Sequence, residues 1–229
     1  MSRDTILQEL AEVGAIIRDS HFVYTKGELG PDRDHGPDYI NKDAITVHPL
    51  LVVGVANELV DFVLHAKIQT IASPAVAGAI IGSVTANWLG VEMGKEGEVK
   101  FVYLDKEGDG LVLKRGFPEF VRGQRVCVVE DVLNSGGTAR QTVDVVRQHG
   151  GQVVAVVAIA NHGGVTAESL GVGRLHSLID VPMPKYPSND CPLCKAGVPV
   201  RVDLGHGHEF LRSLPSGERR RLAPPGYTC

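Results

Sequence analysis

The sequence predicts an α/β fold with a central, mostly parallel sheet flanked by helices, and two observations carry this prediction. Apolar segments with strand-like and helix-like spacing alternate along residues 68–181, which is the pattern of strands joined by helical crossovers. The runs at residues 126–129 and 153–159 are apolar throughout, as expected for strands buried on both faces of a parallel sheet. A chain of 229 residues can bury a sizeable core without a disulfide or a metal.

Each expected element rests on its local pattern. Apolar residues recur at helical spacing in residues 4–18 and 49–64, and the small residues of 77–89 predict a helix that packs closely on a sheet. Residues 26–38 are rich in Gly, Asp and Pro and predict a loop. The other expected elements are strands at 39–42, 68–72, 99–104, 111–113, 125–129, 153–159 and 175–181 and a helix at 138–149.

Composition excludes several classes of protein. The net charge of −4 argues against a broad basic surface for nucleic acid. No apolar run reaches the roughly 20 residues of a membrane span, and the amino terminus does not read as a signal peptide. Four cysteines do not suggest a disulfide framework, and Cys127 reads as a small core residue. We expect a cytoplasmic protein without nucleic-acid or membrane partners.

Residues 126–140 carry the chemistry. An apolar strand ends in Glu130 and Asp131, a polar glycine-containing loop follows at 134–138, and a helix then begins. Loop amides and the helix N-terminus suit a phosphate, and adjacent acids after a buried strand should face a ligand, a cation or solvent. The run lacks the lysine of a Walker loop and the Gly-x-Gly-x-x-Gly fingerprint. It therefore predicts a site for a phosphorylated sugar, with an ordinary polar turn as the alternative.

A second loop has the same placement. Residues 72–78 end a strand and open the small-residue helix, so they lie where ligands bind in parallel sheets. Small residues also serve close packing of a helix on a sheet, which is the alternative interpretation.

These motifs resemble the type I phosphoribosyltransferase family, whose hallmark is an apolar strand, two acids and a Thr/Ser-Gly-Gly-Thr/Ser loop. Further segments are similar to the bacterial orotate phosphoribosyltransferases, and the resemblance spans most of the chain. The segments are residues 21–27, 39–44, 101–131, with Lys114-Arg115-Gly116-Phe117, and 186–199, with Cys191-Pro-Leu-Cys194.

The resemblance implies a Mg²⁺-dependent transfer of the phosphoribosyl group from phosphoribosyl pyrophosphate to orotate in pyrimidine biosynthesis. Glu130 and Asp131 are then expected on the ribose and near Mg²⁺, directly or through the ribose or water. The 5′-phosphate is expected at Asn134, Ser135, Gly136, Gly137 and Thr138, with Thr142 nearby, and the pyrophosphate at Ser73, Pro74, Ala75, Val76, Ala77 and Gly78.

Basic residues complete the implied site. Lys26 and Lys42 are candidates for the carboxylate of the base. Lys106, Lys114 and Arg115 are implied, with Asp131, as catalytic, on a mobile loop that reaches the neighbouring subunit of a homodimer. Asp105 and Asp109 depart from the basic residues of the family, and Lys26 lies one position later than expected.

We expect residues 1–181 to form the phosphoribosyltransferase domain, with residues 1–48 as an N-terminal hood, and residues 182–229 to form an irregular extension. Alternative functions are a phosphoribosyltransferase for another nucleobase, a non-catalytic regulator that senses phosphoribosyl pyrophosphate, and a zinc-stabilised interaction module built on the extension. Cys191 and Cys194 with His206 and His208 are the zinc candidates; a turn packed by small residues is the favoured alternative.

Overall fold

The computed structural model describes residues 3–26 and 33–228, which fall into two compact units. Unit 1 comprises Met1–Val13 and Lys42–Pro182, and unit 2 comprises Gly14–Asn41 and Met183–Cys229. Residues 14–41, assigned by the sequence to the hood of the first domain, therefore group with the C-terminal extension.

Unit 1 is built on a six-stranded sheet. Its strands lie in the order β10-β9-β8-β5-β6-β7, and all neighbours are parallel except β7, which runs antiparallel to β6. The mostly parallel sheet predicted from the alternating pattern is confirmed. The strands are β5 (Thr70–Pro74), β6 (Lys100–Glu107), β7 (Gly110–Val112), β8 (Arg125–Leu133), β9 (Gln152–Asn161) and β10 (Leu175–Asp180).

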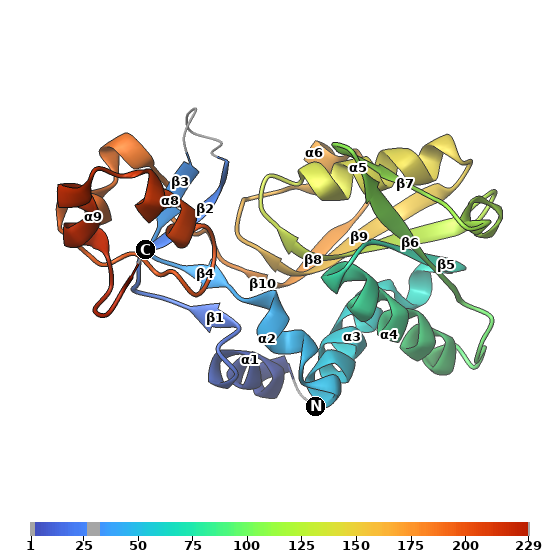
Figure 1. The fold of residues 1–229 in the computed structure, drawn as a ribbon. Helices are drawn as coiled ribbons and strands as arrows, with labels where there is room; N and C mark the ends of the chain where they lie inside the picture. The colour runs from blue at the N-terminus through green and yellow to red at the C-terminus, as the bar shows by residue number, and fades with distance from the viewer. Residues whose placement is uncertain (1–2, 27–32, 229) are drawn as a thin grey trace. The chain divides into compact units, whose positions relative to one another are not determined.

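Helices cover both faces of this sheet (Figure 1). On one face α3 packs against β9, β10 and α4, and α4 packs against β5, β6 and β8. On the other face α5 packs against β5, β7, β8 and β9. The helical elements of unit 1 are α1 (Arg3–Glu12), α2 (Lys42–Thr46), α3 (Pro49–Val63), η1 (Leu64–Ala66), α4 (Ala77–Glu92), η2 (Phe117–Phe120), α5 (Gly137–Gln148) and α6 (Ala167–Leu170).

Residues 49–66, which form α3 and η1, are the one helical stretch of the described chain that is long and apolar enough to cross a membrane. A buried core helix has the same composition, and α3 packs on α1, on α4 and on the sheet.

Small residues let α4 approach the sheet closely, as the sequence predicts. A Cβ atom on Gly82 would lie 2.1 Å from the Ser73 Oγ and 3.0 Å from the Phe101 Cε2. Gly82 therefore allows the short distance between α4 and the strands β5 and β6. The position of the loop between β5 and α4 depends on this distance.

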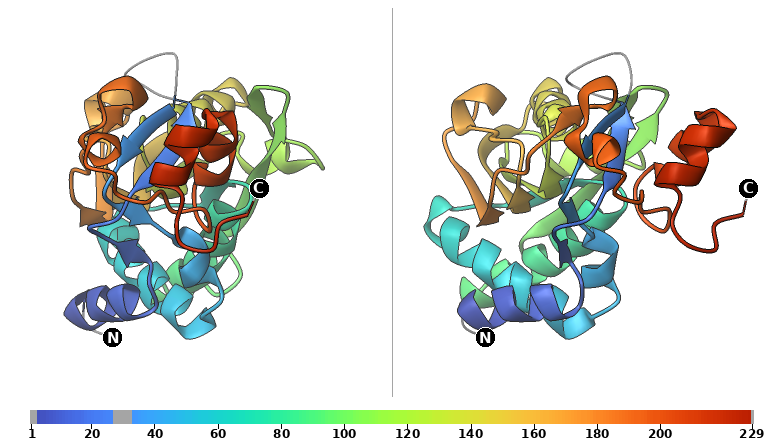
Figure 2. Two further views of the ribbon diagram at one scale, coloured as in Figure 1. Left: turned by 60° about the vertical axis from the view of Figure 1, so that its left-hand side comes forward. Right: turned by 90° about the vertical axis from the view of Figure 1, so that its left-hand side faces the viewer.

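Unit 2 combines residues 14–41 with the C-terminal segment that begins at Met183. Strand β3 (Arg33–Gly36) lies between β2 (Phe22–Lys26) and β11 (Tyr186–Pro187) in an antiparallel sheet, and β1 (Ile16–Ile17) pairs with β4 (Tyr39–Ile40). The remaining elements are η3 (Ser188–Asp190), α7 (Pro192–Lys195), α8 (Gly207–Ser213) and α9 (Ser216–Leu222). Figure 2 shows α8 (red) beside β2 (blue), and a small apolar core joins them.

Three local predictions are wrong in this region. The helix expected over residues 4–18 ends at Glu12, and Ile16 and Ile17 form a strand because they pair with Tyr39 and Ile40. The loop expected over 26–38 contains β3, whose partner β11 lies far along the chain. The extension expected to be irregular contains three helices, α7 to α9. Long-range pairing outweighs local propensity in each strand.

We predict that Gly82→Ala lowers the free energy of unfolding by about 1–3 kcal/mol, because the added methyl group overpacks the contact between α4 and the sheet. Chemical denaturation measures this change. Gly217→Ala is the matched control, since a Cβ atom on Gly217 in α9 meets no atom within 4 Å. The control should be neutral or stabilising by at most about 1 kcal/mol; equal losses in both variants would contradict the packing argument.

Candidate active site

The candidate site lies where two neighbouring strands of the sheet part. The ladder between β5 and β8 ends at the pair Ala72–Val128. Beyond it, β5 continues along β6 to the pair Pro74–Leu104, and β8 continues along β9 to Leu133. This is the point where the strand order reverses, and parallel sheets bind ligands there, beyond the carboxyl ends of the strands.

A cavity of about 480 Å³ occupies this place. It is bounded by the loop after β5, the acidic end of β8, the first turn of α5 and the helix α2. Its lining residues are Lys42, Asp43, Thr46, Pro74, Ala75, Val76, Ala77, Gly78, Ile80, Glu130, Asp131, Val132 and Thr138.

Glu130 and Asp131 lie within β8, because the strand runs to Leu133 and not only to the expected end at 129. The Asp131 amide donates to the Glu130 Oε1 at 3.1 Å, and the Val132 amide donates to the Asp131 Oδ1 at 2.6 Å. Both carboxylates are thereby held by their own backbone.

Glu130 is only 3% exposed, and its Oε2 has no hydrogen-bond partner in the described part of the chain. Burial, reinforced by the adjacent charge of Asp131, raises the pKa of Glu130 well above its usual range. A buried carboxyl oxygen without a partner is costly to fold. Glu130 is therefore ready to receive a hydroxyl or a cation.

Lys42 places a positive charge beside the acids. Its Nζ lies 4.0 Å from the Asp131 Oδ2 and 3.2 Å from the Asp43 Oδ1, and it lines the cavity. The other predicted base-binding lysine, Lys26, belongs to β2 in unit 2, and its side chain lies outside the described residues.

The predicted phosphate loop joins β8 to α5. Gly136 adopts φ +77° at the N-cap of α5, and a Cβ atom there would lie 3.0 Å from the Val165 Cγ1. The N-cap residue of α5, Gly136, provides no side-chain cap, and the Gly137 amide donates to the Ser135 Oγ at the long distance of 3.4 Å. An anion is a stronger acceptor for the amides of this first turn. Ser135, Gly137 and Thr138 are exposed, and Thr138 lines the cavity.

Thr142 does not fit the role expected for it. Its side chain is fully buried, and its hydroxyl donates to the Thr138 carbonyl oxygen at 2.9 Å. Thr142 therefore stabilises the first turn of α5 from within and does not face a phosphate.

Sequence reasoning missed the residues that support this loop. A Cβ atom on Gly163 would lie 1.5 Å from the Asn134 carbonyl oxygen, so only glycine permits this approach. Asn161 exchanges two hydrogen bonds with the backbone of Val165, at 2.8 and 3.0 Å, and Val165 in turn bounds Gly136. The glycines at 163 and 164 after a buried strand were the available signal.

The loop after β5 bounds the cavity except at Ser73. Residues 74–78 line the cavity, and the peptide bond between Ala75 and Val76 is cis. The Ala75 amide donates to the Leu104 carbonyl oxygen at 3.0 Å. Ser73 is fully buried against α4 and does not line the cavity. Side chains alternate between the two faces of a strand, and that of Ser73 lies on the face of β5 that α4 covers.

The basic candidates lie on the hairpin of β6 and β7 and just after it, and none lines the cavity. Lys114 pairs with Glu107 at 2.7 Å, and Arg115 pairs with Asp105 and covers the ring of Tyr103. Lys106 is exposed and forms no ion pair within the described part of the chain.

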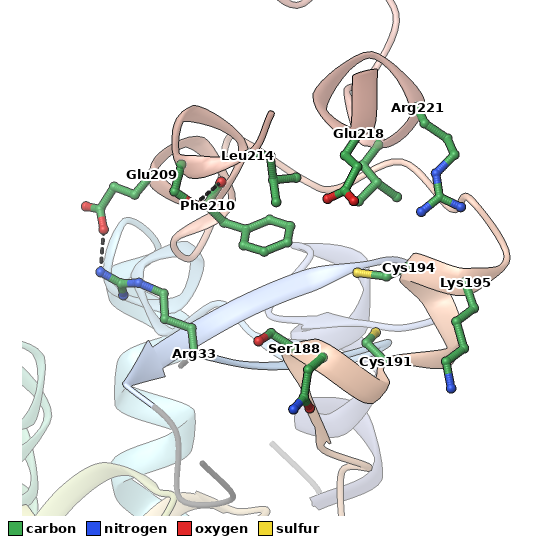
Figure 3. Close-up of a pocket in the computed structure, with 13 residues that line it drawn as sticks. Arg33, Ser188, Cys191, Cys194, Lys195, Glu209, Phe210, Leu214, Glu218 and Arg221 are labelled. Atoms are coloured by element: carbon green, nitrogen blue, oxygen red, sulfur yellow. Dashed lines mark hydrogen bonds and ion pairs between the residues drawn. The ribbon is translucent and has the colours of Figure 1, made fainter. Parts of the chain in front are cut away.

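Cysteines and histidines outside this site are arranged differently from the prediction. His206 contacts Glu209, and His208 contacts Tyr227. Cys191 and Cys194 instead border a second hollow, of about 980 Å³, within unit 2, where Figure 3 shows them on one side with Phe210 and Leu214 above. Cys127 is a buried core residue, as predicted, and burial raises its pKa to about 12.

Comparison with known proteins agrees with this geometry. Residues 41–174 match the model of the phosphoribosyl transferase domain. The chain is 28% identical to the orotate phosphoribosyltransferase of Thermotoga maritima over 203 residues, which cover 88% of this chain and 99% of that protein. It is 29% identical to the orotate phosphoribosyltransferase of Desulforamulus reducens over 200 residues, 87% of this chain and 95% of that protein.

Solved structures share the fold. Orotate phosphoribosyltransferase from Mycobacterium tuberculosis, in complex with phosphate, superimposes with a TM-score of 0.53 at 17% identity and covers 78% of this chain and 95% of its own. Adenine phosphoribosyltransferase from Thermoanaerobacter pseudethanolicus gives a TM-score of 0.55 at 21% identity over 76% of this chain and 99% of its own. The predicted resemblance and the type I phosphoribosyltransferase fold are confirmed.

We predict that Glu130→Gln stabilises the protein increasingly as the pH rises. Because the pKa of Glu130 is higher in the folded than in the unfolded chain, the native protein loses stability as the pH rises from about 4.3 toward the raised value. Gln cannot ionise. The free energy of unfolding of Glu130→Gln should therefore exceed that of the wild type by a margin that grows by about 1.4 kcal/mol per pH unit in that window.

Urea denaturation of both proteins at several pH values measures this margin. Glu119→Gln is the control, since Glu119 is exposed and pairs with the exposed Arg122; the free energy of unfolding of this variant should differ little from that of the wild type at every pH. A margin for Glu130→Gln that does not change with pH would contradict the assigned burial cost.

Proposed function

Because the chain belongs to the phosphoribosyl transferase domain family, we propose that it transfers the phosphoribosyl group of phosphoribosyl pyrophosphate to orotate, giving orotidine monophosphate and pyrophosphate. The observation that carries the proposal is the meeting of three groups around one cavity: the acids of β8, the loop after β5 and the N-terminus of α5. Relatives named orotate phosphoribosyltransferase that align with 88% of the chain support the choice of base. The cytoplasm stays the expected location.

The donor fits the cavity by charge. The amides at the start of α5 and the hydroxyl of Thr138 suit the 5′-phosphate, because a helix N-terminus carries positive potential. Residues 74–78 lead into α4, which also lacks a side-chain cap, and the amides of residues 76–78 suit the pyrophosphate at the other side of the acids. The ribose then spans Glu130 and Asp131.

Mg²⁺ fits the same donor set. The Glu130 Oε2 lacks a partner within the described chain, and Glu130 and Asp131 both line the cavity, so the site offers the carboxylate ligands that Mg²⁺ prefers. Bound with the donor, the ion would neutralise charge that develops on the leaving pyrophosphate.

The protein's part in the chemistry is positioning. A nitrogen of the base attacks C1 of the ribose as the bond to pyrophosphate breaks, and holding both partners in line contributes up to about 7–11 kcal/mol. Asp131 stabilises positive charge at C1, and Lys42 is poised for the carboxylate of orotate. Lys106 is the candidate to stabilise the departing pyrophosphate, because Lys114 and Arg115 are engaged by acids.

We predict that the purified protein, with phosphoribosyl pyrophosphate and Mg²⁺, converts orotate to orotidine monophosphate, as followed by chromatography. Uracil, hypoxanthine and adenine should give no comparable product. Turnover of another base in place of orotate would contradict the choice of substrate and keep the reaction class. Donor binding without turnover of any base would identify a regulator and contradict the enzyme.

We predict that Lys106→Ala lowers kcat by about 100-fold, the effect of losing one group that stabilises charge in the transition state. Lys100→Ala is the matched control on the same strand, since the exposed Lys100 Nζ donates to the Gly97 carbonyl oxygen and Lys100 does not line the cavity; its kcat should change less than about twofold. Equal effects in the two variants would remove Lys106 from the mechanism.

The same variant tests the expected homodimer. If Lys106 completes the site of a neighbouring subunit, mixing inactive Lys106→Ala with inactive Asp131→Asn should restore activity, because mixed dimers contain one intact site. No recovery after subunit exchange would contradict a shared site.

A further inference from the structure

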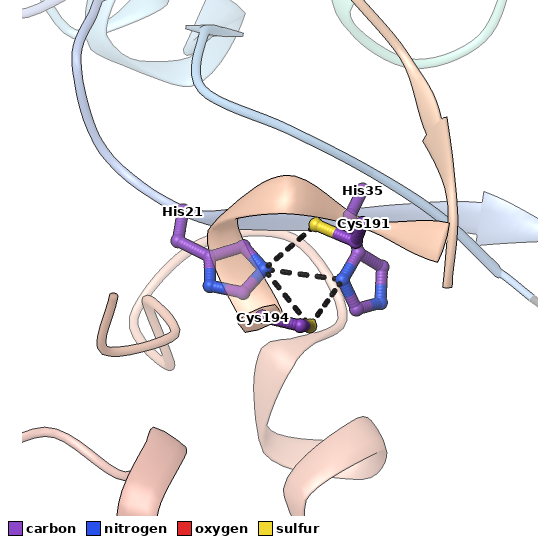
Figure 4. Close-up of side chains that lie close together, drawn as sticks. All are labelled: His21, His35, Cys191 and Cys194. Carbon is purple, nitrogen blue, oxygen red and sulfur yellow. Dashed lines mark hydrogen bonds between the residues drawn. The ribbon is translucent and has the colours of Figure 1, made fainter. Parts of the chain in front are cut away.

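Four side chains that could ligate a metal meet inside unit 2, away from the cavity of unit 1. They are His21, His35, Cys191 and Cys194, and their ligand atoms all lie within 4.8 Å of one another (Figure 4). The first three are at most 1% exposed, and Cys194 is half-buried. Two segments far apart in sequence thus supply two nitrogens and two sulfurs to one point.

Four of the six distances between these ligand atoms lie between 3.1 and 3.8 Å, close to those of a tetrahedron around one ion. The His21 Nε2 lies 3.1 Å from the His35 Nδ1, 3.8 Å from the Cys191 Sγ and 3.7 Å from the Cys194 Sγ. The Cys194 Sγ lies 3.3 Å from the His35 Nδ1. Zinc with bonds of about 2.0–2.1 Å to nitrogen and 2.3 Å to sulfur separates its ligand atoms by about 3.3–3.8 Å.

The outer contacts prepare His21 as a ligand. Its Nδ1 lies 2.8 Å from the Val198 carbonyl oxygen. A carbonyl oxygen only accepts, so the Nδ1 carries the proton and the Nε2 of the neutral ring turns a lone pair toward the cluster. The turn after Cys191 sets this acceptor, since the Val198 amide donates to the Leu193 carbonyl oxygen at 3.0 Å.

The backbone holds the other ligands in place. His35 lies in the central strand β3, paired with Val23 on one side and Tyr186 on the other. Cys191 and Cys194 flank one turn of α7, which the Lys195 amide closes by donating to the Cys191 carbonyl oxygen at 3.1 Å. The strand β3 and the turn of α7 thus already hold their ligand atoms at the cluster.

Hydrogen bonds alone satisfy this cluster poorly. The single lone pair of the His21 Nε2 is approached by a nitrogen and two sulfurs, and it can accept one good hydrogen bond. Thiols are weak donors, and burial makes unsatisfied polar atoms costly. One cation at the centre would satisfy all four atoms.

We propose that His21, His35, Cys191 and Cys194 bind one Zn²⁺ that is structural. Two imidazoles and two thiolates are the ligand set that favours zinc, and four protein ligands leave no open position for a substrate. The ion joins the N-terminal strands to the C-terminal turn in a unit whose apolar core is small. This site is independent of the proposed transferase activity.

The hollow beside the cluster gives the ion a route. Cys191 and Cys194 line it together with Lys195 and Arg221, and Figure 3 shows Arg221 near the same side as Cys194.

Metal analysis of the full chain tests the proposal directly. Protein purified without chelator and supplied with Zn²⁺ should hold about one zinc per chain, and Co²⁺ in its place should give the intense absorption of a tetrahedral thiolate complex. Cys194→Ser and His35→Asn should each lower bound zinc at least tenfold. His206→Ala, His208→Ala and Cys127→Ala are matched controls outside the cluster and should keep it.

Wild-type protein decides the matter even if the variants fail to fold. A strong chelator should lower its melting temperature, and added zinc should restore it. Three results would overturn the proposal. The wild-type protein could stay free of zinc after zinc is supplied, or it could form a disulfide between Cys191 and Cys194 instead, seen as a loss of two hydrogens in its mass. The bound zinc could also depend equally on His206 and His208.

Discussion

The parallel pairing of β5 with β8, and its early end, is the constraint on which the active site depends. The two strands share only the register from Thr70–Val126 to Ala72–Val128, after which each follows its outer neighbour. The chains that leave them must diverge, and α4 and α5 then begin on opposite faces of the sheet. Two uncapped helix N-termini and two carboxylates consequently face one space, without any insertion or added domain.

The burial of Glu130 is the feature of this arrangement that costs folding free energy. A strand buried on both faces ordinarily carries apolar side chains, yet here it continues from Val129 into a desolvated acid whose pKa is raised by burial and by Asp131. A ribose hydroxyl or a cation would supply the missing partner. The native protein thus retains an unfavourable interaction that a bound donor relieves, a common relation between stability and function.

Local sequence sufficed where one continuous segment forms a feature. The acids of β8 and the turn at Gly136 lie within ten residues, so the strand, turn and helix at the edge of the cavity were predicted from residues 126–140 alone. Prediction from local sequence failed where the interacting residues are far apart in the chain. Strand β3 lies in a Gly- and Pro-rich segment and pairs with β11 about 150 residues away. For the same reason Cys191 and Cys194 were matched with the nearby His206 and His208, and not with His21 and His35.

A crystal structure of the protein with phosphoribosyl pyrophosphate and Mg²⁺ tests the central claim most directly. The account predicts ribose hydroxyls within hydrogen-bond distance of Glu130 and Asp131, the 5′-phosphate on the amides of Gly137 and Thr138, and the pyrophosphate against residues 74–78. Donor bound elsewhere, or bound here with the Glu130 Oε2 still lacking a partner, would contradict it.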